Sequence, residues 1–173
     1  MFYTLISSYN TMDLAKLLTV LCILPLIMLP YILDKIKIYH MDEFLIFFYY
    51  LFILLALVMG CILKLYYKIW WFDLLAHFIS GLSTSIIAFI LLKENKLVSK
   101  KYKWFGFLFI TIFTISIAAF WEYFEFFCDK IFKGDAQWVK TTGVTDTMTD
   151  MLIATLGGML SSIYYLYYLK KKN

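Results

Sequence analysis

Residues 72–92 read FDLLAHFISGLSTSIIAFILL, an apolar run that carries an acid and an imidazole near its start. About 20 apolar residues in a helix cross the hydrocarbon core of a bilayer. Asp73 and His77 are four residues apart, so a helix places both side chains on one face. Ionisable groups inside membranes are costly and usually serve a function. The run therefore predicts a membrane helix that contributes polar groups to a site.

The chain contains five such apolar runs, at about residues 14–33, 44–63, 72–92, 104–127 and 147–169. It is 63% hydrophobic with a mean hydropathy of +0.79, whereas soluble domains are roughly half apolar. Helices satisfy every backbone hydrogen bond across lipid, and the runs lack the polar alternation of membrane β-strands. We expect an all-α, polytopic membrane helical bundle of about five transmembrane helices, forming a single domain over residues 1–173.

The basic residues predict topology rather than nucleic-acid binding. All are lysines, and arginine, the usual residue for bidentate recognition of phosphates and bases, is absent from the sequence. Cytoplasmic loops are enriched in lysine. With five spans, ten lysines share the side of the C-terminus (35, 37, 93, 96, 100, 101, 103 and 170–172) and six lie opposite (16, 64, 68, 130, 133 and 140). We expect a protein of the cytoplasmic (inner) membrane, in contact with lipid and able to form a homo-oligomer. Its N-terminus would lie outside and its C-terminus in the cytoplasm, with residues 1–13 at the interface.

Two later spans carry paired acids at the same predicted depth. Residues 118–130 read AAFWEYFEFFCDK, with Glu122 and Glu125 near the end of the fourth span. Residues 143–158 read GVTDTMTDMLIATLGG, with Asp146 and Asp150 at the start of the fifth. Each pair is three or four residues apart and so lies on one helix face. Successive spans alternate in direction, so all three pairs are expected on the lysine-poor, extracytoplasmic side.

Small residues continue the faces that carry these polar groups: Gly81, Ala118, Ala154 and Gly158. Small side chains let membrane helices approach closely. We therefore expect three tightly packed helices whose shared seam ends in a polar pocket.

Five carboxylates and one histidine at one depth require protons or a cation to offset their charge. A divalent metal, Mg²⁺, Mn²⁺, Fe²⁺ or Zn²⁺, suits such oxygen and imidazole ligands. The candidate metal ligands are Asp73, His77, Glu122, Glu125, Asp146 and Asp150. Simpler roles exist for some: Asp73 and Asp146 are placed to favour a helix N-terminus, and His77 alone fits a core histidine. Glu122 and Glu125, near an expected helix C-terminus, have no such role.

The three motifs together resemble those of YjdF-like proteins, small bacterial inner-membrane proteins. That pattern has Asp-x3-His-x3-Gly, then Glu-x2-Glu, then Asp-x3-Asp-Met before a stretch of small residues, and the likeness covers about residues 70–160. A more distant similarity is to VanZ-like proteins, which would imply a role in the cell envelope and the glycopeptide response. VanZ-like proteins usually have glutamine at the position of Glu125 and asparagine after the last acid, so the chain departs from that pattern. Both resemblances imply a site but no particular reaction.

Three functions are compatible with the residues. The first is a metal-dependent enzyme acting on a lipid or lipid-linked envelope substrate, with His77, Glu122 and Glu125 as candidate catalytic groups. The second is a small cation- or proton-coupled transporter. The third is a non-catalytic envelope or resistance factor in which the polar cluster holds the helices together or binds a partner.

Overall fold

A computed structural model of the protein describes residues 20–21, 23–41 and 43–171, and every regular element in this part is helical. The chain divides into two compact units with the boundary between Phe72 and Asp73. We describe each unit by itself. The expectation of a single domain stays a prediction.

The first unit contains a helix over residues 20–35, in which residue 22 is not described, and a second long helical segment. This segment begins as α2 (Glu43–Ile53) and continues as the π-helix η1 (Leu54–Ile62). The short helix α3 (Leu65–Lys68) follows after Lys64, whose φ of 59° turns the chain. The Tyr66 ring then lies against Gly60, where a Cβ would be 2.2 Å from the ring.

Pro30 explains how the first two helices are joined. A proline has no N–H, so the carbonyl four residues earlier, that of Leu26, lacks its usual helical partner. The hydroxyl of Tyr49 on α2 donates a hydrogen bond to this carbonyl at 2.6 Å, and the hydroxyl of Tyr50 donates to that of Ile27 at 2.9 Å. An unpaired carbonyl is costly in lipid, so Tyr49 offsets the cost of the proline.

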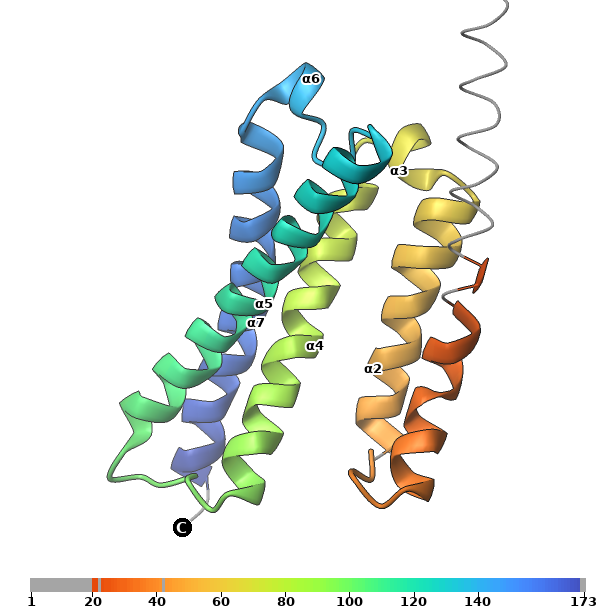
Figure 1. Ribbon diagram of the computed structural model, residues 1–173. Coiled ribbons are helices and arrows are strands. Elements are labelled where there is room, and N and C mark those ends of the chain that lie inside the picture. The colour runs from red at the N-terminus through yellow and green to blue at the C-terminus, as the bar shows by residue number, and fades with distance from the viewer. Residues whose placement is uncertain (1–19, 22, 42, 172–173) are drawn as a thin grey trace, which may run out of the picture. The chain divides into compact units, whose positions relative to one another are not determined.

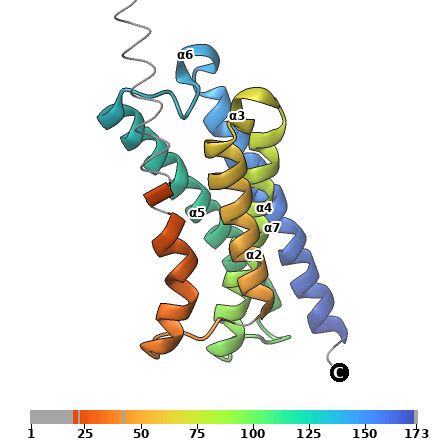
Figure 2. The ribbon, with the colours of Figure 1, turned by 90° about the vertical axis from the view of Figure 1, so that its right-hand side faces the viewer.

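The second unit is built on three long helices that lie side by side (Figures 1 and 2). They are α4 (Phe72–Glu94), α5 (Lys103–Phe132) and α7 (Thr145–Lys171), and the short helix α6 (Val139–Thr142) lies in the connection from α5 to α7. A hydrophobic core at the end away from α6 joins all three helices through Ala88, Leu92, Ile110, Tyr165 and Leu169.

Four helical segments in the described residues are long and apolar enough to cross a membrane: Glu43–Ile62, Phe72–Glu94, Lys103–Ile131 and Thr145–Lys171. They confirm the spans predicted at 44–63, 72–92, 104–127 and 147–169. The span predicted at 14–33 lies partly outside the described residues and stays a prediction, and residues 1–13 lie wholly outside them. One detail differs: α5 continues to Phe132, so Glu125 is about two turns from the helix end.

Small residues bring the three helices of the second unit into close contact. A Cβ on Gly81 of α4 would lie 1.9 Å from the carbonyl oxygen of Ala154 on α7. A Cβ on Gly157 would lie 2.4 Å from the carbonyl oxygen of Phe78, so α4 and α7 meet backbone to backbone. Gly158 instead meets the side chain of Thr114 on α5. The predicted close packing is confirmed at these positions.

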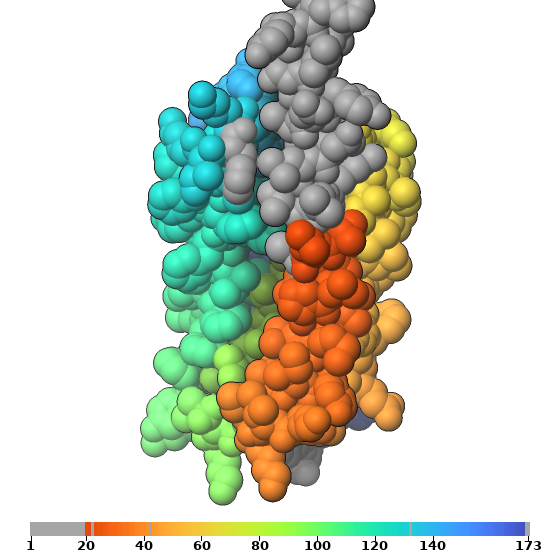
Figure 3. Space-filling model, turned by 45° about the vertical axis from the view of Figure 1, so that its right-hand side comes forward, coloured from red at the N-terminus to blue at the C-terminus, as the bar shows by residue number. Residues whose placement is uncertain are grey.

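Many exposed side chains of α5, which is drawn in green to cyan in Figure 3, are aromatic. Its exposed side chains include Trp104, Phe105, Phe120, Tyr123, Phe124 and Phe127. Such a surface suits contact with lipid, while the opposite side of the helix carries the buried residues Thr114, Ala118 and Glu122.

Gly81→Ala should destabilise the second unit because the added methyl group meets the backbone of Ala154, which has no rotamer to change. Overpacking of this kind costs about 1–3 kcal/mol. We expect a lower thermal unfolding temperature of the purified protein in detergent. The control is Ser116→Thr, which adds a methyl group at an exposed position of α5 and should leave the transition unchanged. Equal stability of the Gly81→Ala protein would contradict the close crossing.

Candidate metal centre

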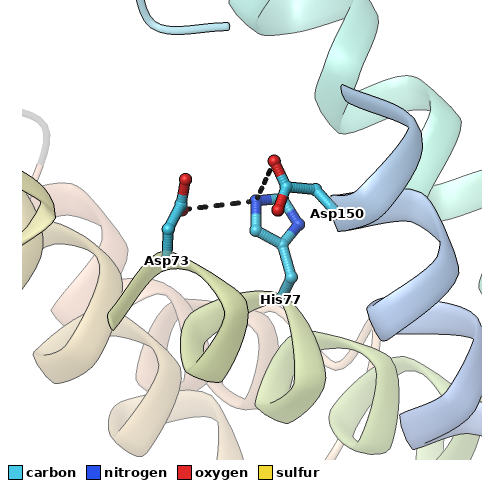
Figure 4. Close-up of side chains that lie close together, drawn as sticks. All are labelled: Asp73, His77 and Asp150. Atoms are coloured by element: carbon cyan, nitrogen blue, oxygen red, sulfur yellow. Dashed lines mark ion pairs between the residues drawn. The ribbon is translucent and has the colours of Figure 1, made fainter. Parts of the chain in front are cut away.

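Asp73, His77 and Asp150 form a compact group between α4 and α7. Figure 4 shows Asp73 and His77 rising from α4 while Asp150 reaches them from α7. The Nε2 atom of His77 lies 3.5 Å from Oδ1 of Asp73 and 3.8 Å from Oδ2 of Asp150. One ligand atom from each residue lies within 4.8 Å of the other two. His77 and Asp150 are buried, with 7% and 2% exposure, and Asp73 is partly buried.

The local sequence explains this placement. Asp73 and His77 occupy the first two turns of α4, and Asp150 the second turn of α7. Gly81 on α4 contacts Ala154 on α7. His77 lies four residues, about one turn, before Gly81, and Asp150 lies the same distance before Ala154. The close approach of the two backbones therefore brings the three side chains together. Both helices also direct their N-terminal ends, which favour negative charge, toward the acids.

The spacing of these atoms fits a shared metal ion better than direct hydrogen bonds. Protein N–H···O hydrogen bonds measure about 2.7–3.2 Å between heavy atoms, and both distances from His77 are longer. Ligand atoms about 2.1 Å from one metal in a tetrahedral arrangement stand roughly 3.4 Å apart. One imidazole and two carboxylates are also a ligand set typical of divalent first-row metals.

Glu122 and Glu125 extend the polar cluster on α5. Glu122 is buried, with 3% exposure. The indole N–H of Trp121 donates a hydrogen bond of 2.9 Å to Oε1 of Glu125. The side chain of Thr147, on the first turn of α7, lies beside Glu122. The glutamates therefore lie next to the N-terminal turns of α7, where Asp146 and Asp150 are located.

Gln137 and Asp129 complete the surroundings of Glu122, and the sequence analysis did not identify either. The amide of Gln137 donates to the backbone carbonyl of Glu122 at 3.1 Å and to its Oε2 at 3.2 Å. Asp129 accepts the backbone N–H groups of Ala136 and Gln137 at 2.7 and 3.2 Å. A buried glutamine in a short polar loop matches no recognisable sequence motif. The only signal in the sequence is that Gln137 stands directly before Trp138 and a helix.

The carboxylates of the cluster repel one another across the three helices. Asp73 experiences repulsion from Asp146 and Glu122, and Asp150 from these two and Asp73. Glu125 is repelled by Glu122, Asp73 and Asp150. Within the described part of the chain, His77 is the only basic side chain that any of them pairs with. Two buried oxygens there, Oε1 of Glu122 and Oδ1 of Asp150, have no hydrogen-bond partner.

The structure brings part of the predicted set of site residues together. Three of the six proposed ligands, Asp73, His77 and Asp150, have atoms close enough to share one ion. Glu122, Glu125 and Asp146 are charged neighbours of this group and lie outside it. Their roles as ligands, and those of His77, Glu122 and Glu125 in catalysis, stay predictions.

Residues 1–171 match the family described as "Predicted membrane protein (DUF2238)", and the chain belongs to this family. No curated protein and no solved structure matches the chain. The similarity to VanZ-like proteins thus stays a prediction.

Asp129→Ala should loosen the segment between α5 and α7, because it removes the acceptor of two backbone N–H groups. Trypsin should then cleave the purified protein faster after Lys133 and Lys140, as followed by mass spectrometry. Lys96 and Lys100, in the loop between α4 and α5, are the internal control and should be cleaved at an unchanged rate. Unchanged cleavage at all four lysines would show that Asp129 does not hold this segment.

Proposed function

We propose that this protein is a metal-dependent membrane enzyme that acts on a lipid or lipid-linked substrate of the cell envelope. In this proposal Asp73, His77 and Asp150 hold a divalent cation. The observation that carries it is the spacing of 3.5 and 3.8 Å around Nε2 of His77, too long for hydrogen bonds and suited to ligands of one ion.

The donor set favours some cations over others. Imidazole is a common ligand of Fe²⁺ and Zn²⁺, and carboxylates suit Mn²⁺ and Mg²⁺. A site with one nitrogen and two carboxylates therefore favours Mn²⁺, Fe²⁺ or Zn²⁺ over Mg²⁺. Cysteine thiolates select soft metals. In the described residues, the group of candidate ligand atoms comes from Asp73, His77 and Asp150 and includes no cysteine.

The surroundings of the ligands suggest how a reaction would proceed. A bound divalent ion polarises a carbonyl or phosphoryl oxygen and supplies a nucleophile from water. Glu125, oriented by the indole N–H of Trp121, is the candidate for general acid–base catalysis.

The position of the cluster suggests the class of substrate. The ligands lie in the first two turns of two membrane-spanning helices, and hence near one end of the spans. A molecule with a polar head group and a lipid tail reaches this depth from within the membrane. We further propose that the YjdF-like motifs are those of this family, and that the cluster faces the extracytoplasmic side of the inner membrane.

Purified wild-type protein should contain at least one divalent metal ion per chain, measured by inductively coupled plasma mass spectrometry. Asp150→Asn should reduce the content at least tenfold, because it removes a buried charged ligand. The matched control is the exposed pair of His40 and Asp34, whose Nδ1 and Oδ1 atoms lie 2.7 Å apart. Asp34→Asn should leave the metal content unchanged. Metal-free wild-type protein whose unfolding temperature does not rise with added Mn²⁺ or Zn²⁺ would contradict the metal site.

Purified protein in lipid nanodiscs should release phosphate or an acyl group from a lipid-linked substrate, tested on a panel of envelope lipids by mass spectrometry. Turnover should depend on the divalent ion and fall at least 100-fold in Asp73→Asn. Glu94→Gln, near the other end of α4, is the control and should keep full activity. If chelation leaves turnover unchanged, the reaction does not use the proposed metal.

A further inference from the structure

Asp150 presents its two carboxylate oxygens to different surroundings. Oδ2 lies 3.8 Å from Nε2 of His77, on the side of the three-residue group. Oδ1 is fully buried and has no hydrogen-bond partner. A carboxylate with one oxygen at a cation site and the other buried and unpartnered can bridge two cations.

Glu122 offers an unpartnered oxygen of the same kind from α5. Gln137 holds its Oε2, while Oε1 is buried without a partner. Thr147 of α7, three residues before Asp150, lies beside Glu122, and residues three apart share one face of a helix. The two unpartnered oxygens thus belong to one cluster. A buried polar atom without a partner costs about 1–3 kcal/mol, so two in one cluster require an explanation.

The charge of the cluster leads to the same conclusion. It contains five carboxylates, of Asp73, Glu122, Glu125, Asp146 and Asp150, and no lysine pairs with them in the described residues. One divalent ion beside His77 would offset two negative charges. A second would offset two more, and Glu122, Glu125 and Asp146 are the carboxylates that the three-residue group leaves over.

We infer that the cluster holds two divalent cations, the second bound between Glu122 and Asp150, with Asp150 bridging the two ions. This inference rests on the proposed metal site at Asp73, His77 and Asp150. Gln137 fixes the orientation of Glu122. Pairs of metal ions about 3.5–4 Å apart stabilise both the attacking and the leaving oxygen in phosphoryl transfer. A two-ion centre therefore favours a phosphorylated, lipid-linked substrate.

The test measures Mn²⁺ stoichiometry on the purified full-length protein, loaded with Mn²⁺ and desalted. Wild-type protein should bind two Mn²⁺ ions per chain, and electron paramagnetic resonance should show exchange coupling between them. Glu122→Gln should bind one Mn²⁺ ion without exchange coupling. Glu94→Gln, an acid near the other end of α4, should bind two. The stoichiometry of the wild-type protein is informative even if Glu122→Gln does not fold.

The possible results separate the two proposals. One Mn²⁺ ion in both wild-type and Glu122→Gln protein would overturn the second ion and leave the first site in place. A shared proton between Glu122 and Asp150 would then account for their unpartnered oxygens. No bound Mn²⁺ in the wild-type protein would overturn the first site as well.

Discussion

The close crossing of α4 and α7 is the constraint on which the polar cluster depends. Gly81 and Ala154 allow the two backbones to touch, which larger side chains would prevent. Both helices begin at the same end of the second unit. His77 and Asp150, each one turn before the contact, therefore lie at the same height along the two helices. The packing of small residues and the position of the candidate ligands are therefore one feature of the fold.

Stability alone does not account for the acids at this position. Each charge at the centre of a membrane helix costs about 2.5–3.5 kcal/mol even on the most lenient scale, and less toward the helix end where these acids lie. Mutual repulsion adds to the cost in this cluster. The two N-terminal helix ends favour Asp73 and Asp146, but they do not satisfy the buried oxygens of Glu122 and Asp150. Bound cations, as proposed, would offset the repulsion and supply partners for these oxygens.

The sequence was sufficient to predict the four long apolar helical segments and the shared helix faces of the polar pairs, because apolar length and spacing of three or four residues determine both. It was not sufficient to separate Asp73, His77 and Asp150 from Glu122, Glu125 and Asp146, since that depends on how far α4, α5 and α7 are rotated about their axes. Asp129 illustrates a second limit. Its contacts with the backbone of Ala136 and Gln137 depend on loop geometry that has no periodic pattern in the sequence. The C-terminal end of α5 was also predicted too early, because the sequence becomes less apolar before the helix ends.

The most direct measurement is the anomalous scattering of Mn²⁺ in crystals of the purified protein. A metal centre predicts a peak about 2.0–2.2 Å from Nε2 of His77 and from oxygens of Asp73 and Asp150. A map without a peak at this position in protein crystallised with excess Mn²⁺, together with direct hydrogen bonds of less than about 3.2 Å between His77 and either aspartate, would contradict the metal centre.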